Sequence, residues 1–245
     1  MSVMLEVRGL DKSFGGIRAV NDCSFDIEAG TITSLIGPNG AGKTTMFNLI
    51  NNVIKSDAGS TRFEGTRITH KMPHKLTRLG IGRTFQVTRV LDDMTVLENM
   101  VVGSSAGNLR ETFGSRMLSS EVDRALQLLE FVGIEQYAYS RAELLSYGQR
   151  KLLEFSAVLM SNPRLVMLDE PAGGVNPALL QRMVDRVRQL NAEGLTFLIV
   201  EHNMDLVMDL SDSVIVMAHG EVLIHGSPDE VQNDGRVLDA YLGKA

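Results

Sequence analysis

The segment from Gly37 to Thr44 limits what this chain can fold into more than any other part of the sequence. It reads GPNGAGKT, which fits G-x-x-x-x-G-K-[ST], the pattern of a phosphate-binding loop. Ile32–Ile36 before it is a short apolar run typical of a buried strand, and Thr44–Ile54 after it has the pattern of a helix. A strand, a glycine-rich turn and a helix in this order predict a domain of the α/β class with an anion site at the helix start.

The residue types in this loop suit a nucleoside triphosphate. Glycines let the backbone N–H groups converge on an anion, and Lys43 can bring a positive charge to the outer phosphates. Thr44 supplies a hydroxyl of the kind that Mg²⁺ prefers. The alternative, a glycine-rich turn that binds nothing, is disfavoured by the strand and helix on either side. The predicted nucleotide-binding residues of the loop are Gly37, Pro38, Asn39, Gly40, Ala41, Gly42, Lys43, Thr44 and Thr45.

Length and composition exclude several classes of protein. The 245 residues suit one large α/β domain, or a core with an inserted subdomain. A net charge of −6 argues against nucleic acid as a partner, because phosphate contacts need a basic face. Cys23 is the only cysteine, which fits a reducing cytoplasm. We see no signal peptide and no apolar run near the ~20 residues that a membrane helix needs, so we expect a soluble chain.

The hydrophobic pattern predicts a core interrupted by a helical segment. Residues 1–90 and 161–245 read as the nucleotide-binding core, and residues 91–160 read as mainly helical. In this segment Ser120 marks a helix start, Val122, Leu126 and Leu129 form its apolar stripe, and Gly133 ends it. Further predicted strands cover Thr61–Thr66, Arg83–Gln86, Arg164–Leu168, Thr196–Val200 and Ser213–Met217, and further helices cover Pro177–Ala192 and Asn203–Leu210.

Two carboxylates follow the apolar run Leu165–Leu168. In a doubly wound sheet, the carboxyl end of such a strand lies at the same edge as the phosphate-binding loop. Asp169 could therefore hold Mg²⁺, and Glu170 could orient or deprotonate an attacking water. Without the loop at Gly37–Thr44, the same residues would read as a core strand that ends in a polar turn.

The segment Leu145–Gln149, LSYGQ, opens another predicted helix. Ser146 and Gln149 have the spacing of an ordinary capping box. Gly148, however, weakens the first turn and leaves bare backbone where a ligand could approach. The segment therefore reads either as a helix cap or as a second anion site. Arg150 and Lys151, which follow it, read as a solvated helix face.

Taken together, these motifs resemble those of the ABC-type ATPases. The resemblance covers about Glu6 to Leu242 and rests on the order of the motifs: the phosphate-binding loop, LSYGQ as a variant of the LSGGQ signature, the Asp169-Glu170 strand end, and Val200-Glu201-His202. It implies a P-loop NTPase core with a mostly parallel sheet, an N-terminal antiparallel β subdomain and an inserted helical subdomain. It also implies an enzyme that binds ATP and Mg²⁺ and hydrolyses ATP to power a membrane transporter.

The resemblance assigns roles to further residues. Phe14 fits the aromatic residue that stacks on adenine, with Val20 nearby, and His202 fits the histidine that contacts the γ-phosphate. Gln86 fits the glutamine that senses Mg²⁺ and links to the permease. By residue type alone, Phe14 reads as a core aromatic, Gln86 as a polar strand end and His202 as a capping or surface histidine. The implied catalytic residues are Glu170, His202 and Gln86; the Mg²⁺ ligands are Thr44, Gln86 and Asp169; and the signature residues, acting in the partner subunit's site, are Ser146, Tyr147, Gly148 and Gln149.

The sequence departs from the family pattern at two positions. Tyr147 replaces the commoner first glycine of the signature, and Asn176 stands where the D-loop, Gly173–Asn176, usually has an aspartate. Other stretches, among them Gly82–Gln86 and Val237–Gly243, resemble the ATP-binding subunit of bacterial branched-chain amino-acid importers. Related urea, amide and lipopolysaccharide transporters share much of this pattern, so those alternatives stay open.

The resemblance also implies partners. These are transmembrane permease subunits, a second ATPase subunit (the same chain or a paralogue) and, indirectly, a periplasmic or extracellular binding protein, with the chain at the cytoplasmic face of the membrane. We expect the permease to dock between Gln86 and Asn99, although these residues could instead pack the helical subdomain. A DNA-repair ATPase would need a long coiled coil, but Ser146 follows Lys43 by only 103 residues. A ribosome-acting ATPase would usually carry two motif sets, and a small-molecule kinase would not explain LSYGQ.

Overall fold

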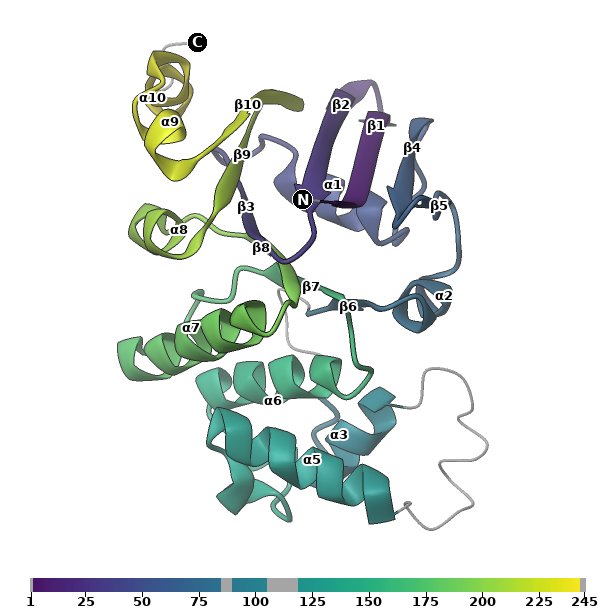
Figure 1. Ribbon diagram of the computed structural model, residues 1–245, viewed down its shortest axis with the longest axis vertical. Coiled ribbons are helices and arrows are strands. Elements are labelled where there is room, and N and C mark those ends of the chain that lie inside the picture. The colour runs from purple at the N-terminus through teal and green to yellow at the C-terminus, as the bar shows by residue number, and fades with distance from the viewer. Residues whose placement is uncertain (1, 85–89, 105–118, 243–245) are drawn as a thin grey trace. The chain divides into compact units, whose positions relative to one another are not determined.

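The computed structural model describes residues 2–84, 90–104 and 119–242 of the chain (Figure 1). The chain divides into two compact units. The first comprises Met1–Leu76 and Asn191–Ala245, and the second comprises Thr77–Leu190. The helical segment predicted over residues 91–160 falls within the second unit.

The first unit contains a four-stranded antiparallel sheet in the order β2-β1-β4-β5. Its strands are β1 (Val3–Phe14), β2 (Ile17–Glu28), β4 (Ala58–Phe63) and β5 (Thr66–Arg67). Gly15 and Gly16 join β1 to β2 with φ angles of 52° and 88°, the pair of positive values that suits a two-residue hairpin. The continuous strand predicted over Thr61–Thr66 is wrong, because Glu64 and Gly65 also have positive φ and turn the chain between β4 and β5.

The first unit also contains four neighbouring strands in the order β10-β9-β3-β8. They are β3 (Ile32–Ile36), β8 (Thr196–Val200), β9 (Ser213–Ala218) and β10 (Glu221–Gly226). β3 runs parallel to β8 and β9, whereas β10 is antiparallel to β9. Every residue of β3 and β8 is buried, as expected for parallel strands covered on both faces. The strands predicted at these two positions are confirmed.

Short helices accompany these strands. They are α1 (Lys43–Ile50), α8 (Met204–Leu210), α9 (Pro228–Gln232) and α10 (Gly235–Leu242), with α9 and α10 beside β10 in Figure 1. Val207, Val231 and Val237, one from each of the last three helices, share a core cluster with Ile36 of β3. α1 ends four residues before the predicted limit, and Asn52, with φ of 54°, follows just beyond its end.

The second unit contains a pair of parallel strands and several helices. The strands are β6 (Ile81–Arg83) and β7 (Leu165–Asp169). The helices are α3 (Val96–Ser104), α5 (Ser119–Val132), α6 (Tyr147–Leu159) and most of α7 (Pro177–Ala192), with 3-10 turns at Glu135–Tyr137 and Ala142–Leu144. Two helices cross the boundary between the units in sequence: α2 (Pro73–Arg78), and α7 at its last two residues. α3, α5 and α6 pack against one another (Figure 1).

The helix α5 lies where the sequence predicted a helix, but the face that it buries differs in part from the predicted apolar stripe. α5 begins one residue before Ser120, and Gly133 follows its end with φ of 74°, as predicted. Its buried face is Ala125, Leu129 and Val132, whereas the predicted Val122 and Leu126 are only half-buried. Helical spacing permits either face, and packing against α3 and α6 selects one of them.

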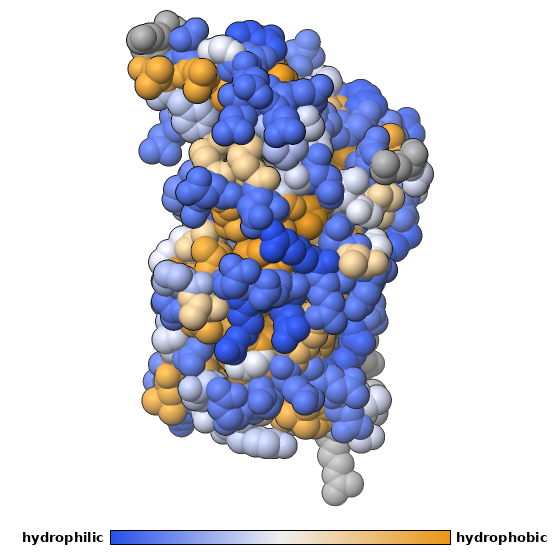
Figure 2. Space-filling model, turned by 60° about the vertical axis from the view of Figure 1, so that its left-hand side comes forward, coloured by the Kyte–Doolittle hydropathy of each residue, from blue (hydrophilic) through white to orange (hydrophobic). Residues whose placement is uncertain are grey.

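Polar and apolar residues are both visible on the surface. Figure 2 shows one face on which hydrophilic residues predominate and apolar residues form separate patches. Among the helices in the described ranges, none is long and apolar enough to cross a membrane.

Candidate nucleotide site

The phosphate-binding loop follows the buried strand β3 and leads into α1. Gly40 and Gly42 have φ angles of 83° and 98°, which favour glycine, and Gly42 is the N-cap residue of α1. A Cβ on Gly37 would lie 2.1 Å from the carbonyl oxygen of Met217. The loop therefore needs glycine for two reasons, backbone conformation and close packing within the first unit.

Lys43 places a positive charge inside this loop. Its side chain is buried, and its Nζ donates hydrogen bonds to the carbonyl oxygens of Gly37 at 2.6 Å and Pro38 at 2.9 Å. Thr44 is exposed and Thr45 is half-buried at the start of α1. A buried ammonium group beside a helix N-terminus fits a phosphate ligand in charge and in hydrogen-bond donors.

The predicted adenine-contacting pair differs in accessibility. Phe14, at the end of β1, is 47% exposed, and the ammonium of Lys12 lies 5.4 Å from its ring centroid. Val20 is completely buried, so it supports the core and offers no surface of its own to a ligand. Phe14 alone of the two is available for stacking in this conformation.

His202 projects from the first unit just after β8. Its side chain is 63% exposed, and its Nδ1 lies 3.8 Å from the carboxylate of Glu201. That carboxylate is buried and accepts hydrogen bonds from the N–H groups of His202 at 2.8 Å and Asn203 at 3.1 Å. Glu201 thus fixes the backbone turn that carries His202. The sequence motif Val200-Glu201-His202 alone did not reveal this role of Glu201.

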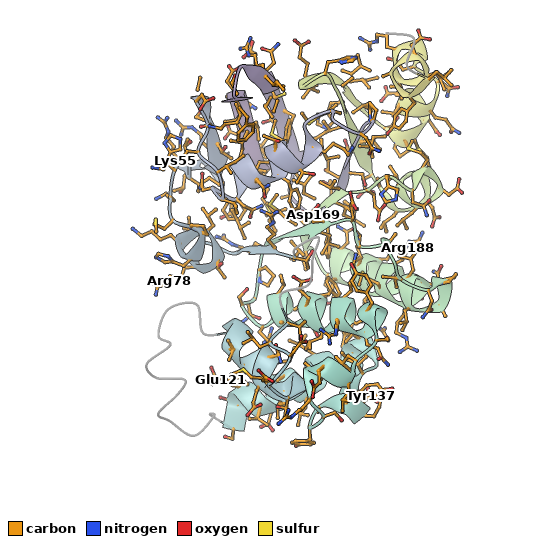
Figure 3. All side chains as sticks on the ribbon, turned by 180° about the vertical axis from the view of Figure 1, so that it is seen from behind. Lys55, Arg78, Glu121, Tyr137, Asp169 and Arg188 are labelled. Atoms are coloured by element: carbon orange, nitrogen blue, oxygen red, sulfur yellow. The ribbon has the colours of Figure 1, made fainter. Side chains whose placement is uncertain are left out.

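Asp169 and Glu170 lie at the end of β7 in the second unit; Figure 3 labels Asp169 there. Asp169 is 3% exposed and pairs with Arg83 of β6 at 3.3 Å. Burial raises the pKa of Asp169, and the adjacent Arg83 acts in the opposite direction. Sequence reasoning missed Arg83 because the ion pair depends on the pairing of β6 with β7.

Glu170 has an unusual backbone for its residue type. Its φ is 49°, in the left-handed region that non-glycine residues seldom occupy, and its side chain is half-buried. Strain of this kind is concentrated at functional sites. The turn after β7 is therefore consistent with a functional carboxylate, although the role of Glu170 stays a prediction.

No group of three or more His, Cys, Asp or Glu residues within the described ranges could hold a metal ion by itself. Mg²⁺ bound with a nucleotide needs only one or two protein carboxylates, because phosphate oxygens and waters complete its shell. Asp169 supplies an oxygen donor of the required type, as does Thr44 in the first unit. Gln86, the third predicted ligand, lies outside the described residues, and so does the end of the strand predicted over Arg83–Gln86.

The signature segment forms the capped start of α6. Ser146 is the N-cap: its Oγ accepts from the N–H of Gln149 at 3.4 Å, and its own N–H donates to Oε1 of Gln149 at 2.8 Å. The predicted capping box is thus confirmed. Gly148 is buried, and a Cβ there would lie 2.8 Å from Cδ1 of Leu179. Close packing on α7 is one physical reason for glycine at this position.

The interpretation of Arg150 and Lys151 as a solvated helix face is wrong. Arg150 is half-buried and pairs with Asp92 at 2.5 Å. Lys151 is 6% exposed, and its Nζ donates to the backbone carbonyl oxygen of Glu170 at 2.5 Å. Charge type predicts exposure only when no partner is close in space, and the fold supplies partners for both residues.

Residues 20–173 match the model of the ABC transporter family, and residues 221–245 match that of the branched-chain amino acid ATP-binding cassette transporters. The chain therefore belongs to the ABC transporter family and is an ATP-binding cassette ATPase. This confirms the predicted resemblance and the P-loop NTPase fold with its antiparallel β subdomain.

Individual relatives and solved structures resemble this chain over nearly its whole length. The chain is 40% identical to the probable branched-chain amino acid transport ATP-binding protein LivG of Archaeoglobus fulgidus, across 98% of this chain and 95% of that protein. It is 38% identical to the high-affinity branched-chain amino acid transport ATP-binding protein LivG of Salmonella typhimurium, across 99% of this chain and 98% of that protein. The ADP conformation of MJ1267, an ATP-binding cassette of an ABC transporter, superposes with a TM-score of 0.89 at 36% identity, across 99% and 100%.

Proposed function

We propose that this chain is the ATP-hydrolysing subunit of a membrane importer for branched-chain amino acids. The proposed substrate class rests on one observation: residues 221–245 match the model of the branched-chain amino acid transporters. These residues lie outside the nucleotide-binding motifs. Relatives whose names specify branched-chain amino acid transport match this chain over nearly its whole length. Urea, amide or lipopolysaccharide transport is the competing substrate assignment.

In the proposed site, the loop Gly37–Thr45 surrounds the phosphates of ATP, and Phe14 stacks on the adenine. Lys43, already inside the loop, would exchange its two carbonyl partners for the β- and γ-phosphates. Mg²⁺, held by Thr44, Asp169 and Gln86, would neutralise charge on the phosphate oxygens.

Glu170 is the proposed group that orients or deprotonates the attacking water. His202, presented by the turn that Glu201 fixes, would contact the γ-phosphate and stabilise the charge that develops as the bond to it breaks. The main contributions in such a phosphoryl transfer are positioning and charge stabilisation, which fixed polar groups supply.

A second ATPase subunit is proposed to complete each site. Ser146, Tyr147, Gly148 and Gln149 of one subunit would approach the γ-phosphate bound by the other, with the N-terminus of α6 directed at the anion. In a homodimer with two-fold symmetry, both composite sites form together. A permease, bound at the cytoplasmic face of the membrane near residues 86–99, would convert this closure into transport; an external binding protein would deliver the substrate.

The proposal is tested by reconstitution with the permease subunits co-purified from native membranes. Vesicles containing the complex should take up radiolabelled leucine, isoleucine or valine only when ATP is enclosed on the side of this chain. Urea and short amides are the competitor substrates. Uptake of those compounds without uptake of branched-chain amino acids would reject the proposed substrate class and leave the ATPase assignment standing.

A further inference from the structure

Lys151 is a buried cation that contacts two segments already assigned to the nucleotide site. It lies on α6 one turn after Tyr147, so the two side chains share a face of the helix. Its ammonium lies 5.5 Å from the centroid of the Tyr147 ring and 2.5 Å from the carbonyl oxygen of Glu170. Burial of an ammonium group is unfavourable unless other groups replace its water. The aromatic face and the carbonyl oxygen provide part of that replacement.

The carbonyl that Lys151 contacts belongs to the strained turn after β7. Glu170 has φ of 49°, and its carbonyl oxygen also accepts a hydrogen bond from the N–H of Gly173 at 3.2 Å. Two donors therefore fix the orientation of this peptide group. A left-handed residue keeps its conformation only when the surroundings hold it. The direction of the Glu170 side chain depends on this backbone, so it depends in part on Lys151.

The start of α6 is packed tightly on the segment that follows this turn. A Cβ on Gly174 would lie 2.9 Å from Cε1 of Tyr147, and a Cβ on Gly148 would lie 2.8 Å from Cδ1 of Leu179. These close contacts leave little room for the helix start to move independently of the turn. A shift at Ser146 or Tyr147 must therefore be transmitted to Lys151 and to the peptide group of Glu170.

We propose that Lys151 is a positioning residue that couples the signature segment of a subunit to the Glu170 carboxylate of the same subunit. This rests on the proposed function, in which Ser146 contacts ATP held by the partner and Glu170 acts on the ATP of its own subunit. Lys151 then connects two different nucleotide sites. Binding of ATP at one site orients the carboxylate at the other, and Tyr147, in place of the commoner glycine, supplies the aromatic surface on which the cation rests.

The test begins with ATP hydrolysis as a function of ATP concentration. Lys151→Met keeps the length of the side chain and removes the charge and the donor. It should lower kcat by about 10- to 100-fold with little change in KM, because a displaced catalytic group slows the chemical step. The Hill coefficient should fall toward one. Lys151→Arg, which keeps a cation and N–H donors, should recover most of kcat. Lys55→Met, which removes an exposed lysine of the first unit labelled in Figure 3, is the matched control and should behave as wild type.

A second measurement separates positioning from general structural damage. In the Glu170→Gln background, light scattering should show MgATP-dependent dimers at the same protein concentration with or without Lys151→Met, since the P-loop and Ser146 are unchanged. Tyr147→Leu combined with Lys151→Met should lower kcat less than the product of the single effects, because the two residues act as one unit. A purely structural lysine would weaken dimer formation and kcat together.

The outcomes distinguish this inference from the proposed function. If wild type hydrolyses ATP and Lys151→Met retains both its kcat and its Hill coefficient, the coupling role is wrong and the ATPase assignment stands. Equal loss of kcat in the Met and Arg variants, together with lost dimer formation, also overturns the coupling role. If wild type with MgATP neither hydrolyses nor dimerises, the proposed function itself fails and the coupling role falls with it.

Discussion

The α-carbon of Gly42 faces the carbonyl oxygen of Ala19 so closely that a methyl group there would lie 2.3 Å from that oxygen. Ala19 belongs to β2, so the antiparallel sheet of the first unit constrains the last glycine of the phosphate-binding loop. The α-carbon of Gly42 and the carbonyl oxygen of Ala19 are both backbone atoms, so they cannot move aside as the end of a flexible side chain would. The sequence motif explains why glycine suits this position, and this contact shows why nothing larger fits.

We expect Gly42→Ala to destabilise the protein much more than Gly40→Ala. Both glycines have positive φ, which costs an alanine about 1–2 kcal/mol, but a Cβ on Gly40 meets no atom within 4 Å. The clash with Ala19 should add about 2 kcal/mol or more to the loss at Gly42. Urea unfolding of both variants measures the difference. An equal loss of unfolding free energy in the two variants would contradict the close contact between Gly42 and Ala19.

Lys43→Ala should remove useful binding of MgATP. The substitution deletes the buried ammonium that the loop surrounds, and no other charged side chain of the loop can replace it. Calorimetric titration with MgATP provides the measurement, and thermal unfolding without nucleotide checks that the variant is folded. Wild-type affinity in a folded variant would show that the loop does not bind phosphate through Lys43.

Glu170→Gln should lower ATP turnover by about 10²–10⁴-fold and leave MgATP binding intact, because it keeps the shape of the side chain and removes the base. Gln has the same backbone requirement at φ of 49°, so the strained turn is retained. Single-turnover hydrolysis and nucleotide affinity should be measured on the same preparation. Turnover within about twofold of wild type would reject Glu170 as the catalytic carboxylate.

Cys23 should make stability fall between about pH 9 and 11. Its thiol is buried and donates to the carbonyl oxygen of Gly220 at 3.0 Å, and burial raises its pKa from 9.0 to about 11. The unfolded thiol ionises first as pH rises, which stabilises the unfolded state and lowers the free energy of unfolding by up to about 3 kcal/mol. Below pH 9 the effect is absent.

Urea unfolding of wild type and Cys23→Ala across this pH range isolates the thiol, because the other titrating groups are common to both proteins. The alanine variant should lose less stability than wild type between pH 9 and 11. If the free energy of unfolding falls equally with pH in wild type and in Cys23→Ala, the native thiol ionises near its ordinary pKa.

Leu91→Asp should uncouple the ATPase from the permease without changing basal hydrolysis. Leu91 is 46% exposed, and its backbone is held by Asn99, which accepts from its N–H at 2.8 Å and donates to its carbonyl oxygen at 3.0 Å. Single exposed apolar side chains are common on protein surfaces, so the choice of Leu91 rests on the predicted permease surface between residues 86 and 99. Stimulation of ATPase activity by the reconstituted permease is the measurement. Val53→Asp, at a 48% exposed valine of the first unit, serves as the control.

Full coupling in the Leu91→Asp variant would place the docking surface elsewhere and remove the support for residues 86–99. Equal loss in both variants would indicate a general effect of surface charge.

Local sequence determined the features that depend on neighbouring residues. The phosphate-binding loop, the Ser146–Gln149 capping box and the stop at Gly133 could all be predicted, because each needs only a few consecutive residues with particular backbone and hydrogen-bonding properties. The strands at Ile32–Ile36 and Thr196–Val200 could be predicted because buried parallel strands are continuous apolar runs.

Tertiary structure decided what depends on residues far apart in the chain. Lys151 reads as a surface lysine until the fold brings the carbonyl of Glu170 to its ammonium, and Arg83 acquires its carboxylate only when β6 pairs with β7. Gly148 and Gly42 are required partly by Leu179 and Ala19, which no local pattern associates with them. Backbone preference and hydrogen-bond periodicity act over a few residues, so the sequence by itself determined the motifs and their supporting elements. Burial, charge pairing and close contact arise from the folded chain, and they decided which of the remaining side chains could serve the site.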